Sequence, residues 1–190
     1  MDCTSEWTPL LVLVSGAPGS GKTTLARLIA QELDILHLNR DDVLHGVQYS
    51  IQHGAPSTLK SYRGVTLWWG AMEHLLAGGV TMVADGTMYR GEFEGDIRRL
   101  ANFANVINVH CRCSNWLERY RSRQMENYGL ASDSQRLGAM MAKIERTTHQ
   151  IVEPLQSEAT VIEVHTDDGY QPTLDLIVGQ LRQTSPSAGR

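Results

Sequence analysis

A glycine-rich stretch that ends in lysine and threonine has the clearest chemistry in this sequence. It lies between an apolar run, 10–14, and a helical pattern, 22–33. Glycines let a backbone fold around phosphate groups, and the following helix directs its positive dipole end at the same anion. In such a loop Lys22 reaches the β- and γ-phosphates and the Thr23 hydroxyl ligates magnesium. The pattern therefore predicts ATP and Mg²⁺ as cofactors, although no motif separates ATP from GTP. The expected nucleotide contacts are Gly16, Ala17, Pro18, Gly19, Ser20, Gly21, Lys22, Thr23 and Thr24.

Two acidic clusters follow neighbouring apolar runs. Asp41 and Asp42 come after the run 35–38, and Asp85 follows the run 80–84. Ligands of open parallel sheets lie beyond the carboxyl ends of the strands, so both clusters are expected to meet the glycine-rich loop. Transfer of a phosphoryl group to a hydroxyl needs a base, and magnesium needs a carboxylate. We assign Asp41 as the base and Asp85 to the metal side with Thr23, although the two roles could be exchanged. Asp42 is expected to cap the next helix.

An arginine pair follows the fourth apolar run. Ser114 is expected to cap a helix that runs to about residue 125, and Arg119 and Arg123 lie four residues apart on one face of it. The polar stretch 126–132 then resembles a lid. Arginines on a closing lid stabilise the charge that develops in phosphoryl transfer. A solvated basic helix face is the alternative. The predicted catalytic set is Lys22, Asp41, Asp85, Arg119 and Arg123.

The elements that position these residues alternate along the chain. Short apolar runs separated by longer helical patterns indicate an α/β fold, here a three-layer P-loop NTPase fold with a five-stranded parallel sheet and a helical lid. We expect one domain over 1–183 and a disordered tail over 184–190. The predicted strands are 10–14, 35–38, 80–84, 106–111 and 161–164. The predicted helices are 22–33, one from about 41, 58–77, 92–103, 114–125, one ending near 152, and 173–182.

Composition and charge limit the class of partner and the cellular location that we expect. The chain has 190 residues and a formal net charge of −4, so charge alone does not advertise a nucleic-acid partner. Its cysteines are odd in number and lack a zinc-type spacing, which favours reduced thiols and a cytoplasmic location. The N-terminal residues lack the basic start of a signal peptide, and no apolar run is long enough to span a membrane.

Together the motifs resemble a known family. GAPGSGKTTLA, LNRDD, ADGT and the arginine-rich helix are similar to the kinase domain of polynucleotide kinases, and to the wider group that includes zeta toxins and chloramphenicol phosphotransferase. This resemblance covers Gly16 to Arg123. It implies a base at Asp41, a contribution from Asp85 and a catalytic arginine at Arg123 with Arg119 beside it. Leu44 departs from the pattern, because polynucleotide kinases carry an arginine there.

The resemblance and the motifs together predict an ATP-dependent kinase that acts on a hydroxyl group. A nucleic-acid hydroxyl, either a 5′-OH or a hydroxymethylated base, is slightly favoured over a small molecule such as an antibiotic, a nucleoside or a metabolite. A nucleotide-dependent switch or binding module is the third alternative. The acceptor site is expected to involve residues 47–69, in which Trp68 and Trp69 are expected to be structural. The sequence indicates no oligomeric state.

Overall fold

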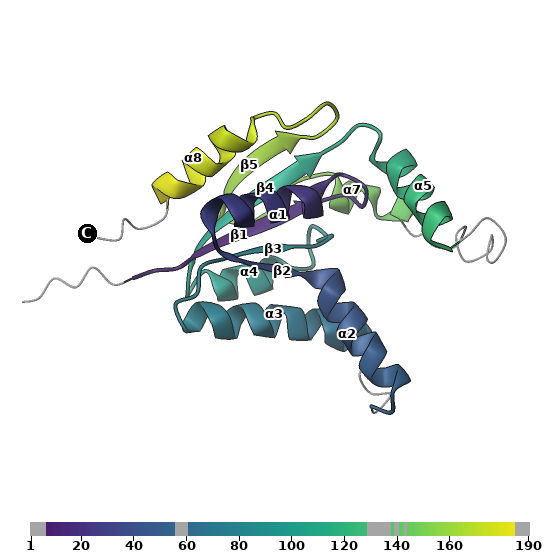
Figure 1. Ribbon diagram of the computed structural model, residues 1–190, viewed down its shortest axis with the longest axis horizontal. Coiled ribbons are helices and arrows are strands. Elements are labelled where there is room, and N and C mark those ends of the chain that lie inside the picture. Colours follow the sequence, from purple (N-terminus) through teal and green to yellow (C-terminus); the bar gives the residue numbers. More distant parts are fainter. Residues whose placement is uncertain (1–6, 56–60, 129–137, 139–140, 143, 185–190) are drawn as a thin grey trace, which may run out of the picture.

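The sheet of this protein has five parallel strands, as the sequence predicts (Figure 1). A computed structural model describes residues 7–55, 61–128, 138, 141, 142 and 144–184. The spatial order is β2-β3-β1-β4-β5, so the strand that precedes the glycine-rich loop is central. The strands are β1 (Leu10–Gly16), β2 (Leu36–Asn39), β3 (Met82–Asp85), β4 (Asn105–Arg112) and β5 (Thr160–His165).

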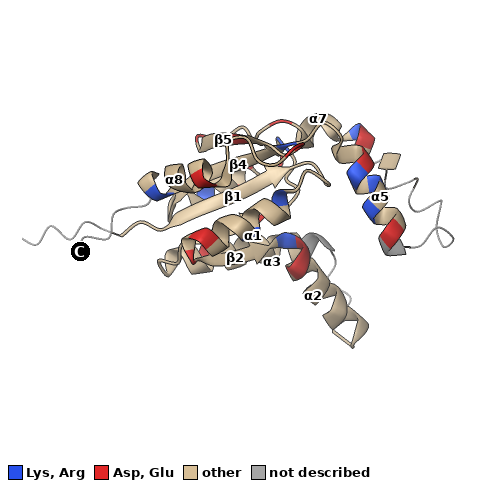
Figure 2. Cartoon of the chain, turned by 45° about the horizontal axis from the view of Figure 1, so that its top comes forward, with Lys and Arg blue, Asp and Glu red and all other residues tan. Residues whose placement is uncertain are grey.

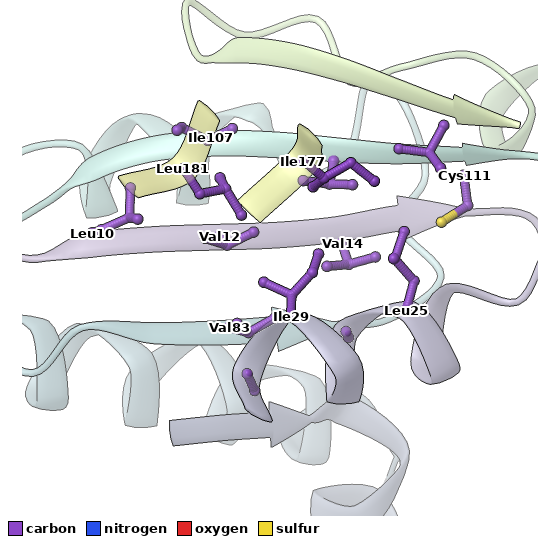
Figure 3. Packing of buried hydrophobic residues seen from close by; sticks show 14 residues of the cluster. Leu10, Val12, Val14, Leu25, Ile29, Val83, Ile107, Cys111, Ile177 and Leu181 are labelled. Atoms are coloured by element: carbon purple, nitrogen blue, oxygen red, sulfur yellow. The ribbon is translucent and has the colours of Figure 1, made fainter. Parts of the chain in front are cut away.

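Helices cover both faces of the sheet. On one face α1 (Lys22–Leu33) and α8 (Leu174–Thr184) pack against alternate residues of β1 and β4, and Figure 3 shows Leu25, Ile29 and Ile177 among the side chains of this cluster. On the other face α3 (Ser61–Ala77) and α4 (Glu94–Leu100) bury their apolar sides. The result is a three-layer α/β fold.

The two tryptophans of α3 both belong to this second layer. Trp68 is 1% exposed and Trp69 is 3% exposed. The Trp68 ring nitrogen donates a hydrogen bond to the Leu38 carbonyl of β2 at 3.2 Å. The prediction that both are structural is therefore confirmed, and Trp68 ties α3 to the strand that leads into the site.

Three elements extend beyond the carboxyl ends of the strands. These are α2 (Arg40–Gln52), α5 (Trp116–Tyr128) and the short α7 (Thr148–Ile151). Figure 1 shows α2 and α5 projecting from the same end of the sheet. No helix in the described part of the chain is both long and apolar enough to cross a membrane.

Some local predictions are wrong. Ser114 does not cap α5, because the helix begins at Trp116 and the Ser114 hydroxyl donates to Asp167 at 2.6 Å. The polar stretch predicted from 126 is helical as far as Tyr128. The predicted helix over 92–103 is shorter, as α4 shows. The rest of the predicted lid, 129–132, and the tail beyond Thr184 lie outside the described residues.

Candidate active site

The loop between β1 and α1 has the backbone that its glycines allow. Gly16, Gly19 and Gly21 have φ angles of 137°, 85° and 80°, in the region that favours glycine. Gly19 also lies against α5, since a Cβ there would stand 2.4 Å from the Trp116 carbonyl oxygen. The Ser20 hydroxyl is buried and has no hydrogen-bond partner among the described residues. An orphaned donor inside a loop of this shape suits the oxygens of a phosphate group.

Lys22 places a buried ammonium group at the same loop. Its Nζ lies 3.4 Å from the Ala17 carbonyl oxygen, a weak contact for a buried cation. Burial lowers the pKa of Lys22 to about 8, although the charges of Asp85 and Asp41 act in the opposite direction. The positive charges of Arg40 and, less strongly, of Arg123 lower this pKa further. A desolvated cation with neighbours of both signs is an arrangement typical of functional sites.

Asp85 ends β3 and is completely buried, at 0% exposure. Its Oδ2 accepts a hydrogen bond from the Thr23 hydroxyl at 2.6 Å. Its Oδ1 lies 2.7 Å from His37 Nε2 and accepts from Asn39 Nδ2 at 2.8 Å. Burial acts to raise the pKa of Asp85, but the hydrogen bonds from His37, Thr23 and Asn39 outweigh it and hold that pKa below its usual value. The carboxylate is therefore ionised at neutral pH.

The Thr23–Asp85 pair has the chemistry of a magnesium site. Both side chains offer oxygen atoms, which Mg²⁺ prefers, and this ion usually keeps water and substrate phosphates as its other ligands. The described residues contain no cluster of three or more His, Cys, Asp or Glu side chains that could hold a metal alone. A protein contribution limited to one hydroxyl and one carboxylate fits an ion that arrives with a nucleotide.

Asp41 lies in the first turn of α2 with its side chain 62% exposed. Arg40 pairs with it at 3.1 Å and also donates to the Thr87 carbonyl, which joins α2 to the loop after β3. The helix cap is Asn39, whose Oδ1 accepts from the Asp42 backbone N–H at 3.0 Å, so the prediction that Asp42 caps the helix is wrong. Both carboxylates are exposed, and of the two only the Asp41 charge contributes to the pKa shift of Lys22.

Arg119 and Arg123 of α5 have different surroundings. Arg119 donates to the carbonyls of Thr166 and Asp167 at 3.1 and 3.0 Å, which fastens α5 to the loop after β5. Arg123 is exposed, and its guanidinium carbon lies 5.9 Å from the centre of the Tyr120 ring. Figure 2 shows charged residues of both signs along α5 and at the start of α2. Arg123 is therefore available to a ligand, whereas the guanidinium of Arg119 is engaged in structural hydrogen bonds.

Sequence reasoning missed two residues that complete this region. His37 lies two positions before Asn39 on β2, so both side chains project from the same face of the strand. Once Asn39 is placed at the site, this two-residue spacing on a strand predicts that His37 lies there as well. Thr166 follows β5 and donates to the Ser20 carbonyl at 2.7 Å, which supports the glycine-rich loop from below. Nothing near Thr166 in the sequence marks this role. Thr24, a predicted nucleotide contact, is exposed in the first turn of α1.

Comparison with known sequences gives short or partial matches. An adenylate kinase of Chlamydia trachomatis is 46% identical over 39 residues, which are 20% of this chain and 16% of that protein. An uncharacterized protein of Mycobacterium tuberculosis is 30% identical over 136 residues, or 67% of this chain and 27% of that protein. The chain thus spans about a quarter or less of these relatives.

Solved structures agree on the fold. A putative kinase from Chloroflexus aurantiacus superposes with a TM-score of 0.70 at 21% identity, covering 94% of this chain and 96% of that one. A gluconokinase from Sinorhizobium meliloti gives a TM-score of 0.60 at 15% identity and covers 95% of each chain. At such identities the likeness shows a shared P-loop α/β fold. The family model described as AAA domain matches residues 11–147, and with the loop, the Thr23–Asp85 pair and the sheet order in place, this chain belongs to the AAA domain family.

Proposed function

We propose that this protein is an ATP-dependent kinase that transfers the γ-phosphate to a hydroxyl group. The observation that carries the proposal is the convergence of Lys22, the Thr23–Asp85 pair and Asp41 at the carboxyl end of the sheet. Nucleotide hydrolysis can also use a residue that orients or deprotonates water, so the kinase proposal depends in addition on the exposure of Asp41, which an acceptor larger than water can reach. The exposed Asp41 carboxylate is placed for an incoming acceptor.

Each residue then has a distinct part in the reaction. The backbone of the glycine-rich loop and Lys22 bind the phosphates, and Thr23 and Asp85 hold Mg²⁺. When bound, this ion neutralises charge on the phosphate oxygens. The oxygen of the acceptor hydroxyl attacks the γ-phosphorus while Asp41 takes the proton from that hydroxyl. The bond between the γ-phosphorus and the oxygen that bridges it to the β-phosphate breaks, and ADP leaves. Arg123 stabilises the charge on the transferred group.

For the acceptor we propose a small hydroxyl compound. Asp41 is exposed near Lys22 and Asp42 is exposed in the same first turn of α2, and two carboxylates repel a phosphate backbone. On the opposite side Arg119 is occupied by backbone carbonyls, which leaves fewer free cations than the sequence suggests. A nucleic-acid hydroxyl is the second candidate, favoured by the NRDD stretch and by the exposed arginines of α5.

The test is transfer of label from γ-labelled ATP with magnesium. Three acceptor pools are offered: small hydroxylated metabolites and antibiotics, 5′-hydroxyl oligonucleotides, and hydroxymethyl-base DNA. We expect label in the first pool. Label in either nucleic-acid pool would refute the acceptor class, and release of free phosphate alone with every pool would refute the kinase assignment in favour of a switch.

Asp41→Asn tests the base and Asp42→Asn is its matched control. General-base catalysis contributes about 10²–10⁴-fold, so Asp41→Asn should lose at least about 100-fold in transfer and keep nucleotide affinity. Asp42→Asn removes an equally exposed charge one residue away and should stay within about threefold of wild type. Equal losses in both variants would indicate a field effect and refute a base at Asp41.

A further inference from the structure

His37 makes a specific contact with the buried carboxylate of the site. It lies in β2, which pairs with β3 so that His37 is opposite Val83 and Asn39 is opposite Asp85. Alternate residues of a strand share a face, which directs both side chains toward the end of β3. The imidazole is 17% exposed and the Asp85 carboxylate is fully buried. His37 therefore lies between the buried Asp85 carboxylate and solvent.

The direction of this hydrogen bond follows from its acceptor. The ionised Asp85 carboxylate can only accept, so His37 Nε2 carries a hydrogen and donates it to Oδ1 at 2.7 Å. Asn39 donates to the same oxygen at 2.8 Å. Two donors on one strand hold Oδ1 in place, and the remaining oxygen, Oδ2, is directed at the Thr23 hydroxyl. The carboxylate cannot rotate without breaking three contacts.

The two donors to Asp85, His37 and Asn39, differ in their other contacts. Asn39 also caps α2 by accepting from the Asp42 backbone N–H, so its side chain has a structural task of its own. For the His37 ring, the bond to Asp85 is the only hydrogen bond that the described part of the chain shows. A side chain with one partner, and that partner a metal-side carboxylate, resembles the outer-shell groups that orient ligands in metal sites.

We propose that His37 is a positioning residue for the metal site: it fixes the Asp85 carboxylate so that Oδ2 and the Thr23 hydroxyl together face the magnesium ion of a bound nucleotide. This inference rests on the metal role of Asp85 in the proposed function. Loss of an outer-shell partner in metal sites lowers metal affinity or activity by about 10–100-fold.

The experiment measures metal binding directly, with Mn²⁺ as the probe and ADP present, by electron paramagnetic resonance on the whole chain. His37→Leu removes the donor at similar volume, whereas His37→Gln can place an amide N–H near the position of Nε2. We expect Mn²⁺ affinity to fall about 10–100-fold in His37→Leu and to return to within about threefold of wild type in His37→Gln. His74→Leu and His74→Gln, at an exposed position of α3 away from the site, are the controls and should match wild type.

A purely structural role predicts different results. Unchanged Mn²⁺ affinity in His37→Leu would overturn the inference, and so would a glutamine variant as weak as the leucine variant. ADP affinity without metal is measured in parallel, and an equal loss there would mean that the loop itself is disrupted, which also overturns it. Wild-type protein that holds no Mn²⁺ with ADP would overturn the inference at once.

Phosphate transfer is scored separately from metal binding. If wild-type protein holds Mn²⁺ with ADP but transfers no phosphate to any acceptor, the proposed kinase function fails. The metal affinities of the His37 variants still decide the positioning role in that case.

Discussion

Replacing Asp85 by asparagine should separate the fold from the chemistry. In Asp85→Asn the side-chain oxygen can take the place of Oδ1 and continue to accept from His37 and Asn39. The amide nitrogen then faces Thr23, whose hydroxyl can turn from donor to acceptor. All three contacts survive with one reversed in direction. Asp85→Ala instead leaves the His37 and Asn39 donors without an acceptor.

The expected stabilities follow from these contacts. A buried donor without a partner costs about 1–3 kcal/mol, and His37 loses less because its ring is partly exposed. Asp85→Ala should therefore lose about 2–4 kcal/mol, a fall in Tm of about 4–16 °C for a chain of this size. Asp85→Asn should lose about 1 kcal/mol, because weaker neutral hydrogen bonds are offset by no longer burying a charge.

The assay combines thermal unfolding with magnesium-dependent transfer from ATP. We expect Asp85→Asn to unfold within a few degrees of wild type yet to lose at least about 100-fold in transfer, since the metal-side carboxylate is gone. An asparagine variant as unstable as the alanine variant would refute the hydrogen-bond reasoning. Wild-type transfer at limiting magnesium would refute the metal assignment.

Two further predictions concern the glycine-rich loop. Gly19→Ala should destabilise the protein by several kcal/mol and weaken nucleotide binding, because the new Cβ would lie 2.4 Å from a backbone carbonyl oxygen of α5. The control is Gly91→Ala, which has a similar φ of 92° but no atom of the described residues near the new Cβ, and thermal unfolding should show a loss of only about 1 kcal/mol there. Equal losses in the two variants would show that backbone strain alone matters at Gly19. Since burial lowers the pKa of Lys22 to about 8 and phosphates favour its charged form, nucleotide binding should take up a proton and weaken as pH rises above about 8. Calorimetry in buffers of different ionisation enthalpy measures this uptake, and uptake that persists in Lys22→Met would assign it to another group.

The sequence predicted the frame of this molecule because its signals are local. The bounds of the helix 22–33 are those of α1, since a glycine turn begins it and an apolar period runs through it. The central strands β1, β3 and β4 were found because buried parallel strands are continuous apolar runs, whereas β2 and β5 are edge strands with exposed residues and a weaker apolar signal. Asp85 was placed at the site by the same reasoning, from its position directly after such a run.

What escaped prediction depends on partners distant in the sequence. Arg119 and Arg123 are equivalent by spacing, and only the loop after β5 shows that Arg119 is occupied by backbone carbonyls. Ser114 looked like a helix cap, but Asp167 takes its hydroxyl. Asn39 competed with two following aspartates for the role of cap, and local preference alone does not choose among them. The contact of His37 with Asp85 could not be predicted without the register in which β2 pairs with β3.

The central place of β1 has a consequence for how the chain is made. β1 is the earliest strand along the chain, all seven of its residues are buried, and its neighbours β3 and β4 lie far downstream. A ribosome therefore releases Leu10–Val14 long before either neighbour exists. Until residue 112 has emerged, that apolar segment has unpaired edges of the kind that associate between chains. Nascent chains that stall before that point should need a chaperone to remain dispersed.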